Sequence, residues 1–285
     1  MSTLQNKIDF SVIITAKNAN PNGDPLNGNR PRENYDGFGE ISDVCIKRKI
    51  RNRLQDMGER IFVQSDDRCD DGQKSLHDRA KNCEALSKLS KAKNTDRDQF
   101  AKAACEEWID VRSFGQVFAF KYDSVSVGVR GPVSIQQAES VSPVDIISMQ
   151  ITKSVNGESG KEGKASDTMG TKHKVDFGLY VFHGSINCQL AEKTGFTEED
   201  AEKIKYAIET LFENDCSSAR PEGSMEVRRV YWYKHDSKTP KYSSAKLHRL
   251  MNVTLKANVD RPRRFEDYEI KLDTLEDISP EIFEA

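Results

Sequence analysis

Along this chain, apolar residues recur at every second position in some segments and at helical spacing in others. The order of these segments limits the folds that the chain can adopt. Apolar residues occupy alternate positions at Ile8, Phe10, Val12 and Ile14, which predicts a strand with one buried face. Helical spacing is found in EISDVCIKRKIRNRLQDMG and in FTEEDAEKIKYAIETLFEN. Further strand-like runs are DVRSFGQVFAFKY, VSVGVRGPVSIQQAESV, VDFGLYVFHGSINCQL, MEVRRVYWYKH and LMNVTLKANV. The order strand, helix, strands, helix, strands predicts an α+β fold of ferredoxin or RRM type, with helices on one face of an antiparallel sheet.

Two polar segments interrupt this order within what we expect to be one domain, residues 1–285. Residues 60–110 are charged and poor in β-branched residues, and KSLHDRAKNCEALSKLSKAKN is typical of a helix, so we expect a helical insertion. Residues 152–174 include SVNGESGKEGKASDTMGTKHK, which has four Gly and too little apolar surface to fold alone. Because this segment lies between two strands, it predicts a protruding β-hairpin.

The first predicted helix carries a dense group of cations. Ser42 is a plausible N-cap and Gly58 a plausible stop, while the apolar residues Ile46, Ile50, Leu54 and Met57 lie on one arc. The cations lie beside this arc, Lys47 and Arg51 on one side and Lys49 and Arg53 on the other. We therefore expect cationic edges that face outward and bind phosphate. The alternative is an ordinary solvated face.

The stretch NANPNGDPLNGNRPR, residues 18–32, breaks regular structure between the first strand and this helix. A calcium loop of EF-hand type is excluded, since Pro25 and Pro31 stand where Gly and Glu are required. Main-chain N–H groups with Arg30 and Arg32 favour a loop that contacts phosphate. Two alternatives stay open: a structural loop capped by its own Asn side chains, and a catalytic carboxylate at Asp24.

The segment RSFGQVFAF partly matches the RNA-stacking strand of RRM domains. Gln116 stands where a second stacking aromatic belongs, so this match is weak. The aromatic residues Phe114, Phe118 and Phe120 alternate as core residues do. We therefore favour core packing for them.

Motifs of enzymatic chemistry are absent from the sequence. It has no G-x-x-x-x-G-K-[ST] loop, H-E-x-x-H helix or G-x-S-x-G elbow. The six Cys form no C-x-x-C pair, so we expect reduced thiols, with no metal site and no cofactor.

Charge and hydropathy limit the partners. The net charge of −3 is unlike that of a dedicated nucleic-acid binder, so such a role must rest on a local basic patch with several copies acting together. The amino terminus lacks the layout of a secretory signal, and no apolar run approaches the roughly 18 residues that span a bilayer. We expect a cytoplasmic protein with no membrane partner.

Five segments, taken together and in order, resemble one family. They are NPNGDPLNGNRPR, SDVCIKRKIR, DVRSFGQVFAF, VGVRGPVSIQQAESVSP and TMGTKHKVDFGLYVFHGSIN. The family is the repeated RNA-binding backbone subunit of type I-C CRISPR Cascade, within the RAMP superfamily. The resemblance covers more than half of the chain, and the carboxy-terminal third agrees only in element order.

The resemblance implies a hand-shaped, non-catalytic scaffold. Its palm is a modified RRM, residues 60–110 form helical fingers, and residues 152–174 form a thumb hairpin. Copies stack head-to-tail along the CRISPR RNA, each thumb displaces a base, and the bases between thumbs pair with target DNA. The implied partners are CRISPR RNA, target DNA through the guide, further copies, and the large, small and end-capping Cascade subunits.

We expect one set of residues to contact RNA: those of the opening loop follow from its own chemistry, and the others are implied position by position by the resemblance. They lie in the opening loop, the basic helix, the segment after the fingers, and the thumb. They are Asn22, Arg30, Arg32, Lys47, Arg48, Arg51, Gly128, Arg130, Gln136, Gln137, Thr168, Met169, Lys172 and His173. In related type III backbones an Asp of the first loop cleaves RNA. The alternative function is therefore a metal-dependent ribonuclease that uses Asp24.

Overall fold

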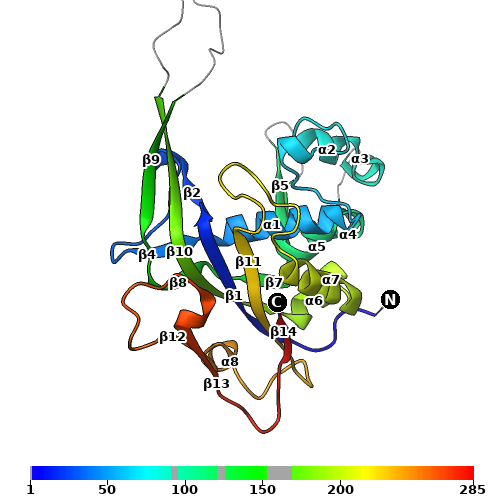
Figure 1. The fold of residues 1–285 in the computed structure, drawn as a ribbon. Helices are drawn as coiled ribbons and strands as arrows, with labels where there is room; N and C mark the ends of the chain where they lie inside the picture. The colour runs from blue at the N-terminus through cyan, green and yellow to red at the C-terminus, as the bar shows by residue number, and fades with distance from the viewer. Residues whose placement is uncertain (1, 91–95, 121–125, 153–168) are drawn as a thin grey trace, which may run out of the picture.

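A central antiparallel sheet organises the protein, and it confirms the α+β prediction (Figure 1). The computed structural model describes residues 2–90, 96–120, 126–152 and 169–285. The strands of the sheet are β1 (Ile8–Ala19), β4 (Phe38–Ile41), β7 (Val133–Ile135), β8 (Ala138–Pro143), β9 (Ile146–Thr152), β10 (Met169–Ile186), β11 (Met225–Lys234) and β14 (Glu281–Glu284). Their order is β14-β11-β1-β10-β8-β4, and β7 and β9 also pair with β10. The alternating first strand therefore lies in the middle of the sheet, where Val12 pairs with Phe182 and Val230.

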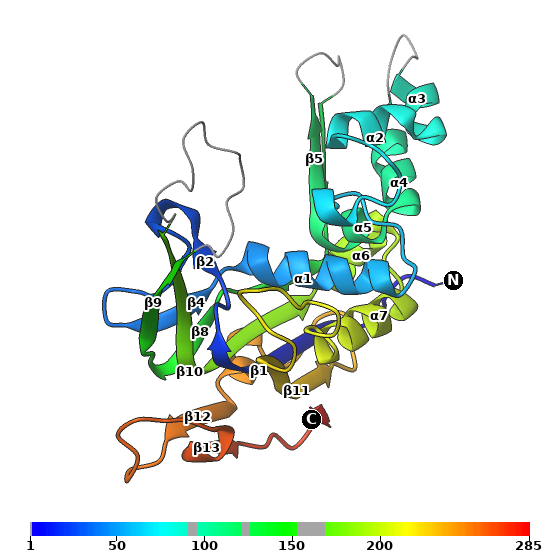
Figure 2. The same cartoon turned by 45° about the horizontal axis from the view of Figure 1, so that its top comes forward.

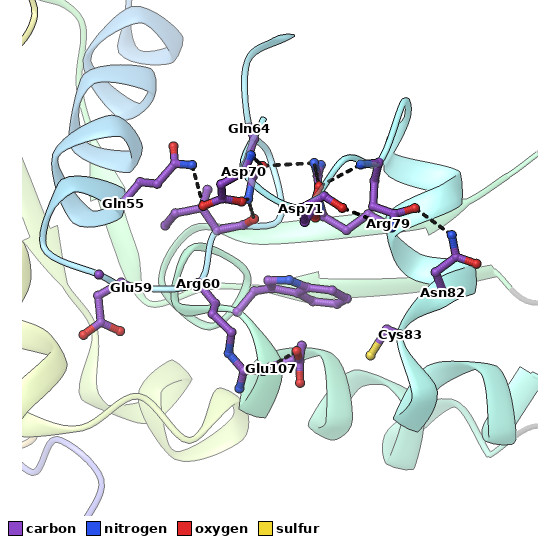
Figure 3. Close-up of a pocket in the computed structure, with 14 residues that line it drawn as sticks. Gln55, Glu59, Arg60, Gln64, Asp70, Asp71, Arg79, Asn82, Cys83 and Glu107 are labelled. Atoms are coloured by element: carbon purple, nitrogen blue, oxygen red, sulfur yellow. Dashed lines mark hydrogen bonds and ion pairs between the residues drawn. The ribbon is translucent and has the colours of Figure 1, made fainter. Parts of the chain in front are cut away.

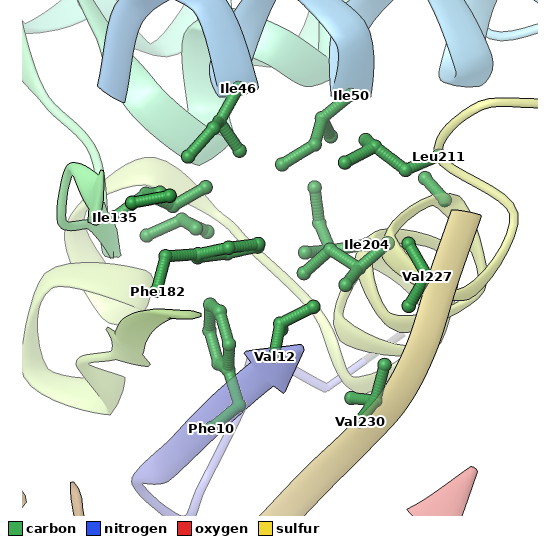
Figure 4. Packing of buried hydrophobic residues seen from close by; sticks show 14 of the residues in the cluster. Phe10, Val12, Ile46, Ile50, Ile135, Phe182, Ile204, Leu211, Val227 and Val230 are labelled. Atoms are coloured by element: carbon green, nitrogen blue, oxygen red, sulfur yellow. The ribbon is translucent and has the colours of Figure 1, made fainter. Parts of the chain in front are cut away.

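Helices cover one face of the sheet, as the apolar arcs predict. They are α1 (Asp43–Asp56), α6 (Cys188–Thr194) and α7 (Glu198–Glu209). Ser42 caps α1 by accepting the N–H of Cys45, and Thr197 caps α7 through a capping box. Ile46 and Ile50 of α1 meet Phe182 of β10 in the main core (Figure 4). None of the helices that the structure describes is long and apolar enough to cross a membrane.

A third layer, which the sequence reading did not anticipate, covers the opposite face (Figure 2). It consists of α8 (Ser244–His248), β12 (Met251–Leu255), the short helix η3 (Phe265–Asp267) and β13 (Tyr268–Leu272). The predicted strand in LMNVTLKANV is β12, which pairs with β13 in a separate two-stranded sheet. Tyr268 of β13 packs against Phe177 of β10. This contact explains why the strands β12 and β13 stack on the main sheet instead of extending it.

The segment that follows α1 packs around its own core, separate from the main one. Its elements are the short helix η2 (Asp66–Arg68), α2 (Leu76–Asn82), α3 (Glu84–Ser90), α4 (Arg97–Glu107), α5 (Ile109–Phe114), β5 (Gly115–Ala119) and β6 (Ser126–Arg130). Phe62, Trp108 and Phe118 form the centre of this second core. The single helix expected in KSLHDRAKNCEALSKLSKAKN is two helices, which break at Cys83.

The strand predicted from Asp110 is wrong over its first half, because Ile109–Phe114 is helical. Arg112 of this helix donates to both carboxylate oxygens of Asp200, at 2.9 and 2.7 Å. Gly115 then adopts a φ of 81° and starts β5. A tertiary ion pair and one glycine thus override the strand-like sequence.

Two hairpins project beside α1. The opening loop forms β2 (Gly23–Asp24), the short helix η1 (Pro25–Asn27) and β3 (Arg30–Pro31). β9 and β10 extend past the sheet as a long antiparallel pair (Figure 1). The predicted thumb is thus present at its base, and residues 153–168 lie outside the described part of the chain.

Candidate nucleic-acid interface

The opening loop is a self-capped hairpin, which is one of the alternatives the sequence left open. The backbone N–H of Asn29 donates to Asp24 O at 2.8 Å, and that of Leu26 donates to Asp24 Oδ1 at 3.2 Å. Asn20 donates from its amide to Asn29 O at 2.6 Å. The backbone N–H groups of Leu26 and Asn29 are therefore engaged within the loop, and a phosphate cradle that uses the remaining N–H groups stays a prediction.

Asn22 ties this loop to the start of α1. Its Oδ1 accepts both the backbone N–H and the hydroxyl of Ser42, each at 2.9 Å. Since Ser42 is the N-cap of α1, the loop and the basic helix are held as one unit. The side-chain oxygen of Asn22 is therefore occupied in the free chain.

The expectation that both edges of α1 face outward with free cations is wrong. Lys49 is 4% exposed and forms an ion pair with Asp215. Burial lowers the pKa of the Lys49 ammonium, against the opposing effect of Asp215. Arg51 donates from Nε to Asp110 at 2.9 Å, with a side chain 13% exposed. These two cations fix α1 to residues that lie far along the chain, in a way that spacing within one helix cannot reveal.

Arg48 lies at an intermediate depth on the same helix. Its Nη1 donates to the carbonyl oxygen of Val63 at 2.7 Å, and burial, reinforced by Arg51, lowers the pKa of the guanidinium. A guanidinium has five N–H donors, so this contact leaves Arg48 with further donors.

Three cations lie closer to the surface, and each pairs with a nearby acid. The ion pairs are Lys47–Asp43 at 2.9 Å, Arg32–Asp24 at 3.3 Å and Arg30–Glu33 at 3.3 Å. We call them the shallow pairs. The side chains of the three cations are between 24% and 40% exposed. These cations are the part of the predicted basic patch that solvent reaches.

The base of the β9–β10 hairpin lies against the opening loop. Arg30 donates to Ser148 Oγ at 3.4 Å, and Ser148 Oγ is 2.8 Å from His173 Nδ1. Lys172 is half-buried beside His173, and Met169 is 63% exposed near the end of the described hairpin. Thr168 lies outside the described residues.

The remaining predicted contacts lie on two other elements. Gly128 and Arg130 are exposed on β6, in the segment with its own core. Gln136 and Gln137 are exposed between β7 and β8, where Gln137 donates to Glu40 at 2.9 Å. The prediction of core packing for the RRM-like aromatic residues is confirmed for Phe118, which is 1% exposed.

A polar pocket of about 370 Å³ lies between the end of α1 and the second core (Figure 3). No described residue of the opening loop or of the β9–β10 hairpin lines it. Its charged groups are already engaged: Arg79 donates to Asp71 at 2.9 Å, and Arg60 pairs with Glu107. Glu59 pairs with Lys203, and Asp70 accepts hydrogen bonds from Gln55 and Gln64. The hydrogen bond from Arg79 lowers the pKa of Asp71 to about 2. The pocket thus presents closed ion pairs and no group held ready for acid or base chemistry.

Asp24 has a structural position in the loop. It caps η1 through the N–H of Leu26 and pairs with Arg32. Among the residues described, no three His, Cys, Asp or Glu side chains are grouped so as to hold a metal ion.

A family model for CRISPR-associated protein Cas7 matches residues 6–273, which is nearly the whole chain. The chain belongs to the Cas7 family. It is 27% identical, over 240 residues, to the CRISPR-associated protein Cas7 of Haloferax volcanii, a match covering 76% of this chain and 67% of that protein.

One solved structure shares the fold, and a second aligns less closely. A chain of a CRISPR RNA-guided surveillance complex in a pre-nicking state aligns with a TM-score of 0.50 and 14% identity, covering 90% of this chain and 84% of that one. A chain of a second CRISPR RNA-guided surveillance complex aligns with a TM-score of 0.48 and 16% identity, over 83% and 72% of the two chains.

Sequence reasoning missed two apolar residues on the hairpin of this Cas7 chain. Met149 and Ile151 are 39% and 51% exposed, and they pair with Lys172 and Gly170 on the same face of the hairpin. The signal was present in IISMQIT, where apolar residues alternate in a strand that leads out of the sheet. None of the residues of this strand is buried.

Proposed function

We propose that this chain is a non-catalytic, repeated backbone subunit that binds CRISPR RNA in a Cascade surveillance complex of subtype I-C. The observation that carries the proposal is the continuity of one surface. The self-capped loop is bonded to the start of α1 through Asn22 and to the base of the hairpin through Arg30. Membership of the Cas7 family and the shared fold of the surveillance-complex chain support the same assignment.

The charge of the chain favours an assembly over a lone binder. Affinity for RNA rises with the number of phosphates that cations neutralise, and a chain of net charge −3 has no overall excess of cations. Copies stacked head-to-tail along one RNA add their contacts on a single strand and gain from effective concentration. The further partners are other copies of the chain, the large, small and end-capping subunits, and target DNA paired to the guide, all in the cytoplasm.

The hairpin is the proposed thumb. Met149, Ile151 and Met169 expose apolar side chains near its described end, beside the half-buried Lys172. Apolar side chains placed between successive bases unstack them, while a neighbouring cation meets the backbone. Each thumb would then displace one base and leave the bases between thumbs free to pair.

Phosphate contacts are proposed for the cations that solvent reaches. Arg30, Arg32 and Lys47 are the first candidates, and Arg48 retains donors for a phosphate oxygen. Arg130, exposed on β6, extends the path along the molecule. Arg51 contributes indirectly, because it holds α1 in place through Asp110.

The test measures binding of labelled CRISPR RNA at several salt concentrations. Arg32→Ala and Lys47→Ala should weaken binding equally for unrelated guide sequences, and each should reduce the slope of log K against log salt, by at most about 0.7. Lys271→Ala, which removes an exposed lysine paired with Glu269 on β13, is the matched control. A wild-type chain with no salt-sensitive RNA binding would overturn the proposal.

A further inference from the structure

We infer that the three carboxylates of the shallow pairs, Asp24, Glu33 and Asp43, act as built-in competitors of RNA phosphate. Each occupies a cation of the proposed interface in the free chain, so each lowers the affinity of a single copy for RNA. The inference rests on the proposed function. The three acids would favour RNA binding by several assembled copies over RNA binding by a single copy.

The three acids lie close to their cations. Asp43 and Glu33 lie within four residues of Lys47 and Arg30, and Asp24 contacts Arg32, which follows the small hairpin β2–β3. Each contact is 3.3 Å or shorter. The acid side chains are between 29% and 42% exposed. The hydrogen bond from Lys47 lowers the pKa of Asp43, so this carboxylate is charged at neutral pH.

The depth of these pairs separates them from the structural ones. Asp110, the partner of Arg51, is 1% exposed, and the side chain of Lys49, the partner of Asp215, is 4% exposed. A phosphate from solvent cannot displace partners buried to that depth without opening the palm. It can displace the shallow partners, because exposed ion pairs are weak and their side chains can rotate into water.

The competition has a defined electrostatic consequence. A cation that already faces a carboxylate neutralises little additional phosphate charge while that carboxylate stays close. Fewer counterions are then released from the RNA than the number of cations would suggest. A lone copy holds RNA weakly, and retention depends on neighbouring copies that add their own contacts.

Neutral isosteres test this directly. Asp43→Asn, Glu33→Gln and Asp24→Asn keep shape and hydrogen-bonding oxygens, and the Asn at 24 can still cap η1. Each variant should bind CRISPR RNA about two- to five-fold more tightly at low salt. Each should also steepen the slope of log K against log salt by about 0.7, a change that a merely structural role would not produce.

Glu269→Gln is the matched control, since it removes the same charge from an exposed pair with Lys271, at 3.2 Å, on β13. If this control tightens binding as much as the three variants do, net charge alone explains the gain and the inference is overturned. Weaker binding by Asp43→Asn would also overturn it, because the carboxylate would then be positioning Lys47. Loss of RNA binding by the wild-type chain would instead refute the proposed function.

Discussion

Arg51 of α1 and Asp110 of α5 join the palm to the segment with its own core, through an Nε to Oδ2 hydrogen bond of 2.9 Å. The two oxygens of Asp110 also accept the backbone N–H groups of Phe62 and Val63, at 2.7 and 3.1 Å. Asp110 is 1% exposed. The buried carboxylate of Asp110 thus holds the backbone at Phe62 and Val63, where the chain leaves α1 for the second core. Arg51 neutralises the charge of this carboxylate.

Arg51→Ala should lower stability. The substitution leaves Asp110 buried without its cation, and breaking such a pair costs about 3–5 kcal/mol. Urea denaturation of the two proteins measures the difference. Lys47→Ala is the control, because its exposed pair with Asp43 contributes at most about 1 kcal/mol. A loss from Arg51→Ala as small as that of the control would show that Asp110 is held by its backbone donors alone.

Stability should fall with acid through His183. Burial, and then the neighbouring His248, whose ring stacks at 4.6 Å, lower the pKa of His183 to about 4. His183 takes up its proton near pH 6.5 in the unfolded chain and only near pH 4 in the folded one. The free energy of unfolding is therefore highest above pH 6.5 and falls, by up to about 3 kcal/mol, as the pH drops toward 4. His183→Gln should flatten this part of the stability profile. Equal pH dependence in both proteins would contradict the assignment.

Gly184 of β10 should not tolerate a side chain. A Cβ there would lie 2.2 Å from Phe10 Cζ and 2.7 Å from the carbonyl oxygen of Ser134. Gly184→Ala therefore strains the stacked pair of Phe10 and Trp232, and we expect a loss of about 1–3 kcal/mol. Gly128→Ala on β6 is the control, since its Cβ would meet nothing within 4 Å. Thermal unfolding of both variants checks the difference.

Asp24 should not act as a nuclease carboxylate. It caps η1 and pairs with Arg32, so we expect CRISPR RNA to stay intact during long incubation of the wild-type chain with Mg²⁺. Gel analysis of the RNA measures this. Cleavage that disappears in Asp24→Ala would support the ribonuclease alternative instead.

The sequence predicted the main sheet and its helices because their signals are local. The period-two run of β1 and the arc that contains Ile46 and Ile50 each lie within one element, and the apolar side chains of both are buried as expected. The prediction that only one face of β1 is buried is wrong, because the layer of α8, β12 and β13 covers its other face as well. Capping by Ser42 is equally local, and that prediction is confirmed.

The same reasoning failed where the partner lies far along the chain. Lys49 and Arg51 have the spacing of a solvated edge, yet their acids are 166 and 59 residues away. Nothing in the helix sequence indicates that these acids fold against it. The helix at Ile109–Phe114 is a similar case, because the pair of Arg112 with Asp200 spans 88 residues. The shallow pairs are local, and inspection of charge spacing in residues 24–47 could have found them.

The central claim, that several copies of this chain line up along one CRISPR RNA, is tested most directly by native mass spectrometry of the chain co-purified with that RNA. The account predicts one RNA bound by several copies, with a number that grows as the RNA is lengthened and falls in the Arg32→Ala, Lys47→Ala double variant. A chain that emerges as a monomer without RNA, or with a single copy per RNA at every length, would contradict the account.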